Sequence, residues 1–254
     1  MDAIIDTAAV CAEIESLLDQ GKALSALQQA QHHWGHHQEW HTLQQLLVGA
    51  RVFAHLGLRR KALACRFLAW RRYPADPEAI YCYVSGQLER RGPLRALHLL
   101  KRYGELATPD ASLLADWLAL KASVYSCYRD WETAGGFMAQ AEQLAPDSEW
   151  IQVEKAALLE RQDDYEGAWA ALESLLTRNN RNAILMGAHL KTLQNDRDGA
   201  IALLQQGMAT LENVTIPLRL SRLYQEAGRW PEAHACLAHA QSFVTDPRDL
   251  EQNL

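Results

Sequence analysis

The sequence lacks the patterns that mark a secreted, membrane-spanning or disulfide-bonded protein. It has only five cysteines, dispersed along the chain, and no Cys-x-x-Cys pair, which fits reduced thiols better than a disulfide framework. No run approaches about eighteen apolar residues. Residues 1–6 have neither the basic start nor the apolar core of a signal peptide. We therefore expect a soluble, cytoplasmic protein without a membrane span.

Short motifs of the common enzyme classes are also missing. There is no glycine-rich phosphate loop, no Gly-x-Ser-x-Gly elbow and no His-Glu-x-x-His pair. Asp163 and Asp164 fall where a helix–helix turn is expected, so helix capping explains them better than catalysis. Cys65 could be paired with His55 as nucleophile and base, but a buried core cysteine is the better explanation. We expect a protein that is not an enzyme and has no cofactor.

Proline and glycine are few, at eight and fourteen, which leaves no long low-complexity linker. What the sequence does contain is a repeated pattern of small residues. An alanine opens the second helix of each predicted helix pair, and these alanines recur every 32 to 38 residues. The seven alanines, called anchors below, are Ala26, Ala62, Ala96, Ala134, Ala168, Ala200 and Ala233.

Other residue types keep fixed distances from the anchors. A glycine stands five residues before the anchor, an aromatic three before, a small residue seven after and a proline twelve after. The matching residues are Gly21, Gly57 and Gly228; Trp131, Tyr165 and Trp230; Ala69, Ala141 and Ala240; and Pro74 and Pro146.

On these residues nearly the whole chain resembles the tetratricopeptide-repeat (TPR) family. The resemblance implies an all-α fold, a right-handed superhelical solenoid of about seven helix-turn-helix pairs. It implies one repeat domain over residues 1–245 and a short polar tail over 246–254. Three departures leave the register open by a residue or two: Gly92 lies one place nearer its anchor, Asn195 replaces a turn glycine, and Gln38 replaces a proline.

Hydrophobic periodicity and helix-ending residues predict the helix bounds. The predicted pairs are 3–19 with 22–34, 39–56 with 59–72, 77–90 with 93–104, 111–128 with 131–144, 148–161 with 164–177, 182–194 with 197–210, and 216–227 with 230–243.

In such arrays, as the resemblance implies, the first helix of each pair lines the concave inner surface. Counting back from the anchors gives candidate partner-binding residues, in which Arg51 and Arg222 share one offset. Arginine side chains could hold a carboxylate or an acidic peptide. The lysine and asparagine set of carboxylate-clamp repeat proteins is not found. The candidate partner-binding residues are Gln44, Arg51, His55, Arg90, Arg161, His189, Arg222 and Gln225.

Charge is unevenly distributed along the chain, whose net charge is −6. Residues 51–102 carry twelve basic and three acidic side chains, a net of +9, and the remainder carries thirteen basic and twenty-eight acidic ones, a net of −15. The leading hypothesis is a scaffold, adaptor or chaperone that binds a peptide or helix of another, possibly acidic, protein. The alternatives are nucleic-acid binding through the basic block, which the net charge disfavours, and a regulatory subunit of an enzyme. Self-association also stays open.

A histidine cluster is the sharpest local feature. His32, His33, His36, His37 and His41 lie within ten residues, a density that could chelate a transition metal. No second segment supplies obvious cysteine or carboxylate ligands, so a polar inter-helix turn is the better explanation, and we expect no metal site.

Overall fold

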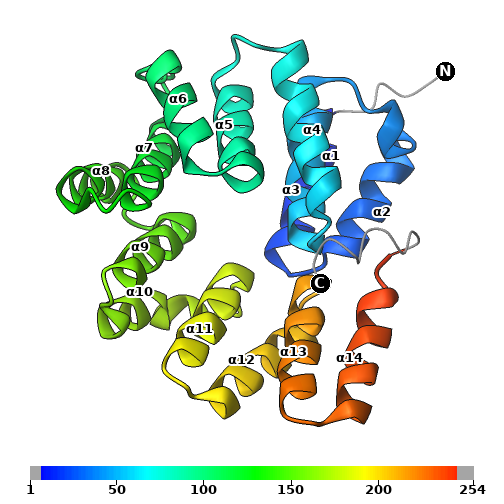
Figure 1. Ribbon diagram of the computed structural model, residues 1–254. Coiled ribbons are helices and arrows are strands. Elements are labelled where there is room, and N and C mark those ends of the chain that lie inside the picture. The colour runs from blue at the N-terminus through cyan, green and yellow to red at the C-terminus, as the bar shows by residue number, and fades with distance from the viewer. Residues whose placement is uncertain (1–6, 245–254) are drawn as a thin grey trace. The chain divides into compact units, whose positions relative to one another are not determined.

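The computed structural model describes residues 7–244, and its helices follow one another in antiparallel pairs (Figure 1). Between Thr7 and Gln241 it contains fourteen α-helices and one 3-10 turn, and no strand. The helices are α1 (Thr7–Asp19), α2 (Ala23–Trp34), α3 (Leu43–Leu56), α4 (Arg59–Arg72), α5 (Pro77–Arg91), α6 (Pro93–Tyr103), α7 (Ala111–Ser126), α8 (Trp131–Leu144), α9 (Glu149–Arg161), α10 (Tyr165–Thr177), α11 (Arg181–Leu193), α12 (Arg197–Thr210), α13 (Thr215–Glu226) and α14 (Trp230–Gln241).

The all-α fold and the seven helix pairs are confirmed, with bounds close to those predicted. The start of α3 is the largest difference, at Leu43 rather than residue 39, because Thr42 and Gln45 form a capping box there. The Thr42 hydroxyl accepts a hydrogen bond from the Gln45 amide at 3.3 Å. The part of the first predicted helix over residues 3–6 and the tail over 246–254 lie outside the described residues.

The anchors are buried as the repeat requires. All seven anchor alanines are at most 3% exposed, which lets the helices of a pair approach closely. Backbone φ is positive, between 59° and 84°, at six positions that lie five residues before an anchor. Only three of these are glycines, so the turn geometry persists where glycine is absent. The six are Gly21, Gly57, Arg129, Asp163, Asn195 and Gly228.

The helices group into two compact units. Unit 1 contains residues 1–73 and 197–254, and unit 2 contains residues 74–196. The division therefore falls inside the sixth helix pair, between α11 and α12. The single repeat domain expected over residues 1–245 stays a prediction.

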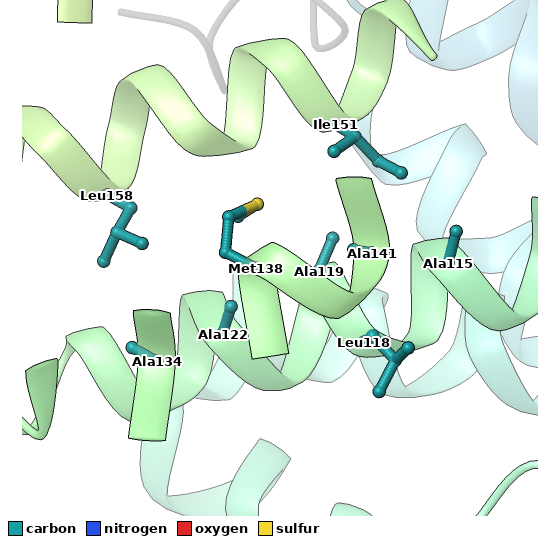
Figure 2. Packing of buried hydrophobic residues seen from close by; sticks show 9 residues of the cluster. All are labelled: Ala115, Leu118, Ala119, Ala122, Ala134, Met138, Ala141, Ile151 and Leu158. Atoms are coloured by element: carbon teal, nitrogen blue, oxygen red, sulfur yellow. The ribbon is translucent and has the colours of Figure 1, made fainter. Parts of the chain in front are cut away.

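The core of unit 2 is built from small residues and a few large aliphatic ones (Figure 2). Ala115, Ala119 and Ala122 of α7 allow close approach of α8, which contributes Ala134, Met138 and Ala141. Ile151 and Leu158 of α9, from the next helix pair, complete the cluster. A helix pair thus buries its apolar face only when its neighbour packs on it, as in other repeat proteins.

Unit 1 is additionally held together by the segment that connects α12 to α13. The Glu212 carboxylate accepts hydrogen bonds from the backbone amides of Leu24 at 2.8 Å and Ser25 at 3.1 Å. These amides belong to the first turn of α2, whose own N-cap, Lys22, provides no side-chain acceptor. Glu212 therefore caps α2 from a distant part of the sequence, and its negative charge suits a helix N-terminus.

The next two residues dock on the turn between α3 and α4. The buried Asn213 side chain donates to the His55 carbonyl and accepts from the Ile216 amide at 3.0 Å. The Val214 amide donates to the Leu56 carbonyl at 2.8 Å. The last helix pair is thereby bonded to the turn of the second.

Candidate protein-binding surface

Two of the predicted arginines lie in unit 1, and each forms an ion pair within the chain. Arg51 Nη2 lies 2.5 Å from Glu15 Oε1, and Arg222 Nε lies 3.2 Å from Glu226 Oε1. Both pairs are exposed, so each contributes at most about 1 kcal/mol to stability. The positive charge that the sequence offered to an acidic partner is therefore partly neutralised within the chain.

The other predicted residues of unit 1 have varied surroundings. Gln44 is exposed in the first turn of α3. The backbone carbonyl of His55 accepts from Asn213, which gives this residue a part in holding unit 1 together. The exposed Gln225 side chain donates to Ser221 Oγ at 3.3 Å.

The predicted residues of unit 2 fall on first helices that polar side chains connect. Arg161 Nη1 of α9 donates to Ser126 Oγ of α7 at 2.7 Å, and Ser126 in turn donates to the Ser123 carbonyl at 2.8 Å. His189 Nε2 of α11 lies 3.6 Å from Glu160 Oε1 of α9. Arg90 is exposed in the last turn of α5.

Two half-buried carboxyl groups lie among these side chains. Burial raises the pKa of Glu154 to about 7, opposed by the Arg161 charge and by a hydrogen bond with Ser123. Burial, and to a smaller extent repulsion from Asp110 and Glu78, raises the pKa of Asp116 to about 6. The pKa of Glu154 is raised further by Asp116 and by Glu89 of α5.

These interactions place side chains of α5, α7, α9 and α11 along one surface. We call it the polar face of unit 2. It is formed by Glu89, Asp116, Glu154, Glu160, Arg161 and His189, together with Ser123, whose side chain is buried. It is mixed in charge and mainly acidic.

The sequence analysis missed Asp116, Ser123 and Glu154. Counting back from the anchor Ala134 of the fourth helix pair, as was done for the other pairs, gives Asp116 and Ser123 as inward positions. The sequence therefore contained the signal for these two residues. Glu154 lies seven residues before Arg161, two helical turns away on the same face of α9, and could have been found in the same way.

One residue of the histidine cluster, His37, packs against aromatic side chains. The His37 ring lies 5.4 Å from the Phe53 ring, and Trp40 Nε1 donates to the Gly35 carbonyl at 3.1 Å. Within residues 7–244 no three His, Cys, Asp or Glu side chains are grouped so that they could hold a metal ion. Part of the cluster lies in the 3-10 turn His37–Glu39, between α2 and α3.

Solved structures show which fold this arrangement has. A tetratricopeptide-repeat protein from Parabacteroides merdae aligns with a TM-score of 0.52 and 13% identity, over 98% of this chain and 97% of that one. A chain of the APC/C hetero-tetramer Cut9–Hcn1 aligns with a TM-score of 0.51 and 11% identity, over 95% of this chain but only 48% of that one.

The chain therefore has the tetratricopeptide-repeat fold, as the resemblance implied. At identities this low the likeness establishes the fold alone. No protein-family model and no curated protein matches the sequence. Among the described residues, no helix combines the length and apolar character needed to cross a membrane.

Proposed function

We propose that this protein is a non-catalytic interaction module that binds a peptide or helix of a partner protein on the polar face of unit 2. The fold supports a protein-interaction scaffold in general, since repeat arrays present aligned first helices to a partner. Scaffold, adaptor and chaperone roles all fit this proposal. The five free thiols favour a reducing compartment such as the cytoplasm.

The observation that carries the proposal is the half-buried polar network of α7 and α9. Carboxyl groups such as Asp116 and Glu154 are costly to desolvate unless they are fully paired. Ionisable groups with perturbed pKa values gather at functional sites more often than elsewhere. A partner that brings hydrogen-bond donors or cations to this surface would offset the cost.

The proposal also changes the expected character of the partner. The sequence favoured an acidic partner because of the basic block over residues 51–102 and the inward arginines, of which Arg51 and Arg222 are paired with Glu15 and Glu226. The polar face of unit 2 instead offers two carboxyl groups at its centre. We therefore expect the partner segment to place basic or amide side chains opposite Asp116 and Glu154.

The test compares two double variants with the same charge change. Glu89→Lys with His189→Glu changes two exposed side chains on first helices, whereas His98→Glu with Glu173→Lys makes the same two substitutions at exposed positions on second helices. Affinity capture from the native cell extract, quantified by mass spectrometry, should recover a partner with wild type and the second variant and lose it with the first. Equal recovery by both variants would contradict the proposal.

A further inference from the structure

A cavity of about 320 Å³ lies in unit 2 at the turns of two successive helix pairs. It is lined by Arg129 and Trp131 of the α7–α8 pair and by Arg161, Gln162 and Asp163 of the α9–α10 pair. Its volume is at the small end for ligand sites, which suits one or two side chains rather than a large cofactor.

The walls of this turn pocket are fixed by hydrogen bonds. The Asp130 amide donates to the Tyr125 carbonyl at 3.3 Å, and the Asp164 amide donates to the Leu159 carbonyl at 3.0 Å. Both turns thus repeat one backbone pattern, and Arg129 and Asp163 are their residues with positive φ. Trp131 packs against the core of unit 2, so its ring is a firm apolar wall.

Two guanidinium groups dominate the chemistry of the pocket. Arg161 is held by Ser126 and retains further N–H donors, because an arginine side chain has five. Arg129 is exposed, and within the described part of the chain it forms no ion pair or side-chain hydrogen bond. The two arginines line the same pocket, and each guanidinium presents a forked set of donors that matches an oxyanion.

The charge of the lining indicates which oxyanion fits. The lining residues themselves, two arginines and the carboxylate of Asp163, leave one positive charge, and Glu154 interacts with Arg161 and reduces it further. The pocket therefore suits a single carboxylate better than a phosphate dianion. Asp163 already accepts from the Tyr165 hydroxyl at 3.2 Å. The helix N-termini nearby are not the anion site, because Asp130 caps α8 and Asp164 caps α10.

We propose that the turn pocket binds one carboxylate of the partner segment between Arg129 and Arg161, with an adjacent apolar group against Trp131. This inference rests on the proposed function and adds an anchoring point at the edge of the polar face. The carboxylate can come from an aspartate or glutamate side chain or from a C-terminus, since both present the same group.

The experiment titrates the full-length protein with short synthetic peptides and follows arginine Nε–Hε and tryptophan indole signals by NMR. One pair of probes is Ac-Gly-Phe-Glu-Phe-Gly-NH2 and its glutamine analogue, and the other is Ac-Gly-Gly-Phe-OH and its amide. In at least one pair, the acid should bind at least tenfold more tightly than the amide and shift the Arg129, Arg161 and Trp131 signals. The pair that shows the difference identifies the source of the carboxylate.

The variant Arg129→Gly deletes a guanidinium while placing the best-suited residue at a positive φ, so the fold is retained. It should weaken binding of the acid probe at least tenfold, whereas Arg178→Gln, at an exposed arginine of the same unit, should leave it unchanged. Equal binding of the acid and amide probes would overturn the carboxylate assignment. So would the absence of binding by any probe at about 10 mM, tenfold above a dissociation constant of about 1 mM. Tighter binding of inorganic phosphate than of either acid would also overturn it.

The same variant separates this inference from the proposed function. If Arg129→Gly still captures the partner that Glu89→Lys with His189→Glu loses, the interaction surface stands and the turn pocket is not part of it. If neither variant loses the partner, the proposed surface itself is wrong.

Discussion

The helix pairs of both compact units follow the same repeat pattern, but different contacts hold each unit together. In unit 2 each helix pair packs on the next pair along the chain, as α7 and α8 do on α9 (Figure 2). In unit 1 the Leu211–Thr215 segment forms hydrogen bonds with the turns of the first two pairs, across 158 and 188 positions of sequence. The repeat pattern alone therefore specifies neighbouring contacts, and the long-range ones need particular residues such as Glu212 and Asn213.

This difference has consequences for stability. Where contacts run only between neighbours, a substitution acts mainly on its own pair and the next. Where distant segments are bonded, a substitution at either segment weakens both. In unit 1, a substitution in either bonded segment should lower the stability of both segments. In unit 2, a substitution should lower the stability of its own helix pair and the next one only.

The largest expected effect comes from Gly57→Ala in unit 1. Gly57 has a φ of +84°, and an added Cβ would lie 2.5 Å from Thr215 Oγ1 and 3.2 Å from the Thr215 backbone nitrogen. The left-handed backbone and the displaced α13 together should lower the free energy of unfolding by about 3 kcal/mol. Urea unfolding followed by circular dichroism measures this loss.

Gly228→Ala is the matched control for that prediction. Gly228 occupies the same turn position, with a φ of +73°, but nothing lies within 4 Å of an added Cβ. Its cost should be only that of the backbone, about 1 kcal/mol. Equal losses for the two variants would show that docking of Thr215 on the Gly57 turn adds nothing to unit 1.

An intermediate effect, dependent on pH, is expected from Glu154→Gln in unit 2. Because burial raises the pKa of Glu154 from 4.5 to about 7, the folded state loses stability as the pH rises through this window. The penalty is absent below about pH 4.5 and complete above about pH 7. The glutamine variant should be less sensitive to pH and gain about 2 kcal/mol over wild type between pH 4.5 and 8.

Urea midpoints at several pH values test this, with Glu173→Gln, at an exposed position of the same unit, as the control for replacing a glutamate by a glutamine. A Glu154→Gln profile parallel to that of wild type would mean that Glu154 ionises in the folded protein as an exposed glutamate does.

Much of the fold could be predicted because its signals are local. Buried alanines such as Ala134 and Ala168 recur at fixed spacing, and capping residues such as Asp76 and Ser148 start helices in sequence. The turn geometry was predicted from glycine alone. Arg129 and Asp163 adopt it too, because the hydrogen bonds of the turn impose positive φ on whichever residue lies there.

The contacts of the candidate site residues were harder to predict than the fold, because many of them depend on packing between pairs. The pairing of Arg222 with Glu226, four residues apart on one helix, could have been predicted. The pairing of Arg51 with Glu15 could also have been predicted, because both residues lie eleven positions before their anchors, Ala62 and Ala26, in successive helix pairs. The capping of α2 by Glu212 joins segments for which no spacing rule exists. The arginines were therefore assigned to a partner although two of them have acids within unit 1.

The smallest expected effect contrasts two turn residues that are not glycine. Arg129 in unit 2 has a φ of 59°, and Asn195 has a φ of 60°. Asparagine tolerates this conformation and arginine does so less readily, so Arg129→Gly should raise the free energy of unfolding by about 1 kcal/mol and Asn195→Gly by much less. Thermal and urea unfolding of the two variants measure the contrast. If Arg129→Gly instead destabilises the protein, the Arg129 side chain contributes to the folded state of unit 2, and its availability to a partner's carboxylate would be reduced accordingly.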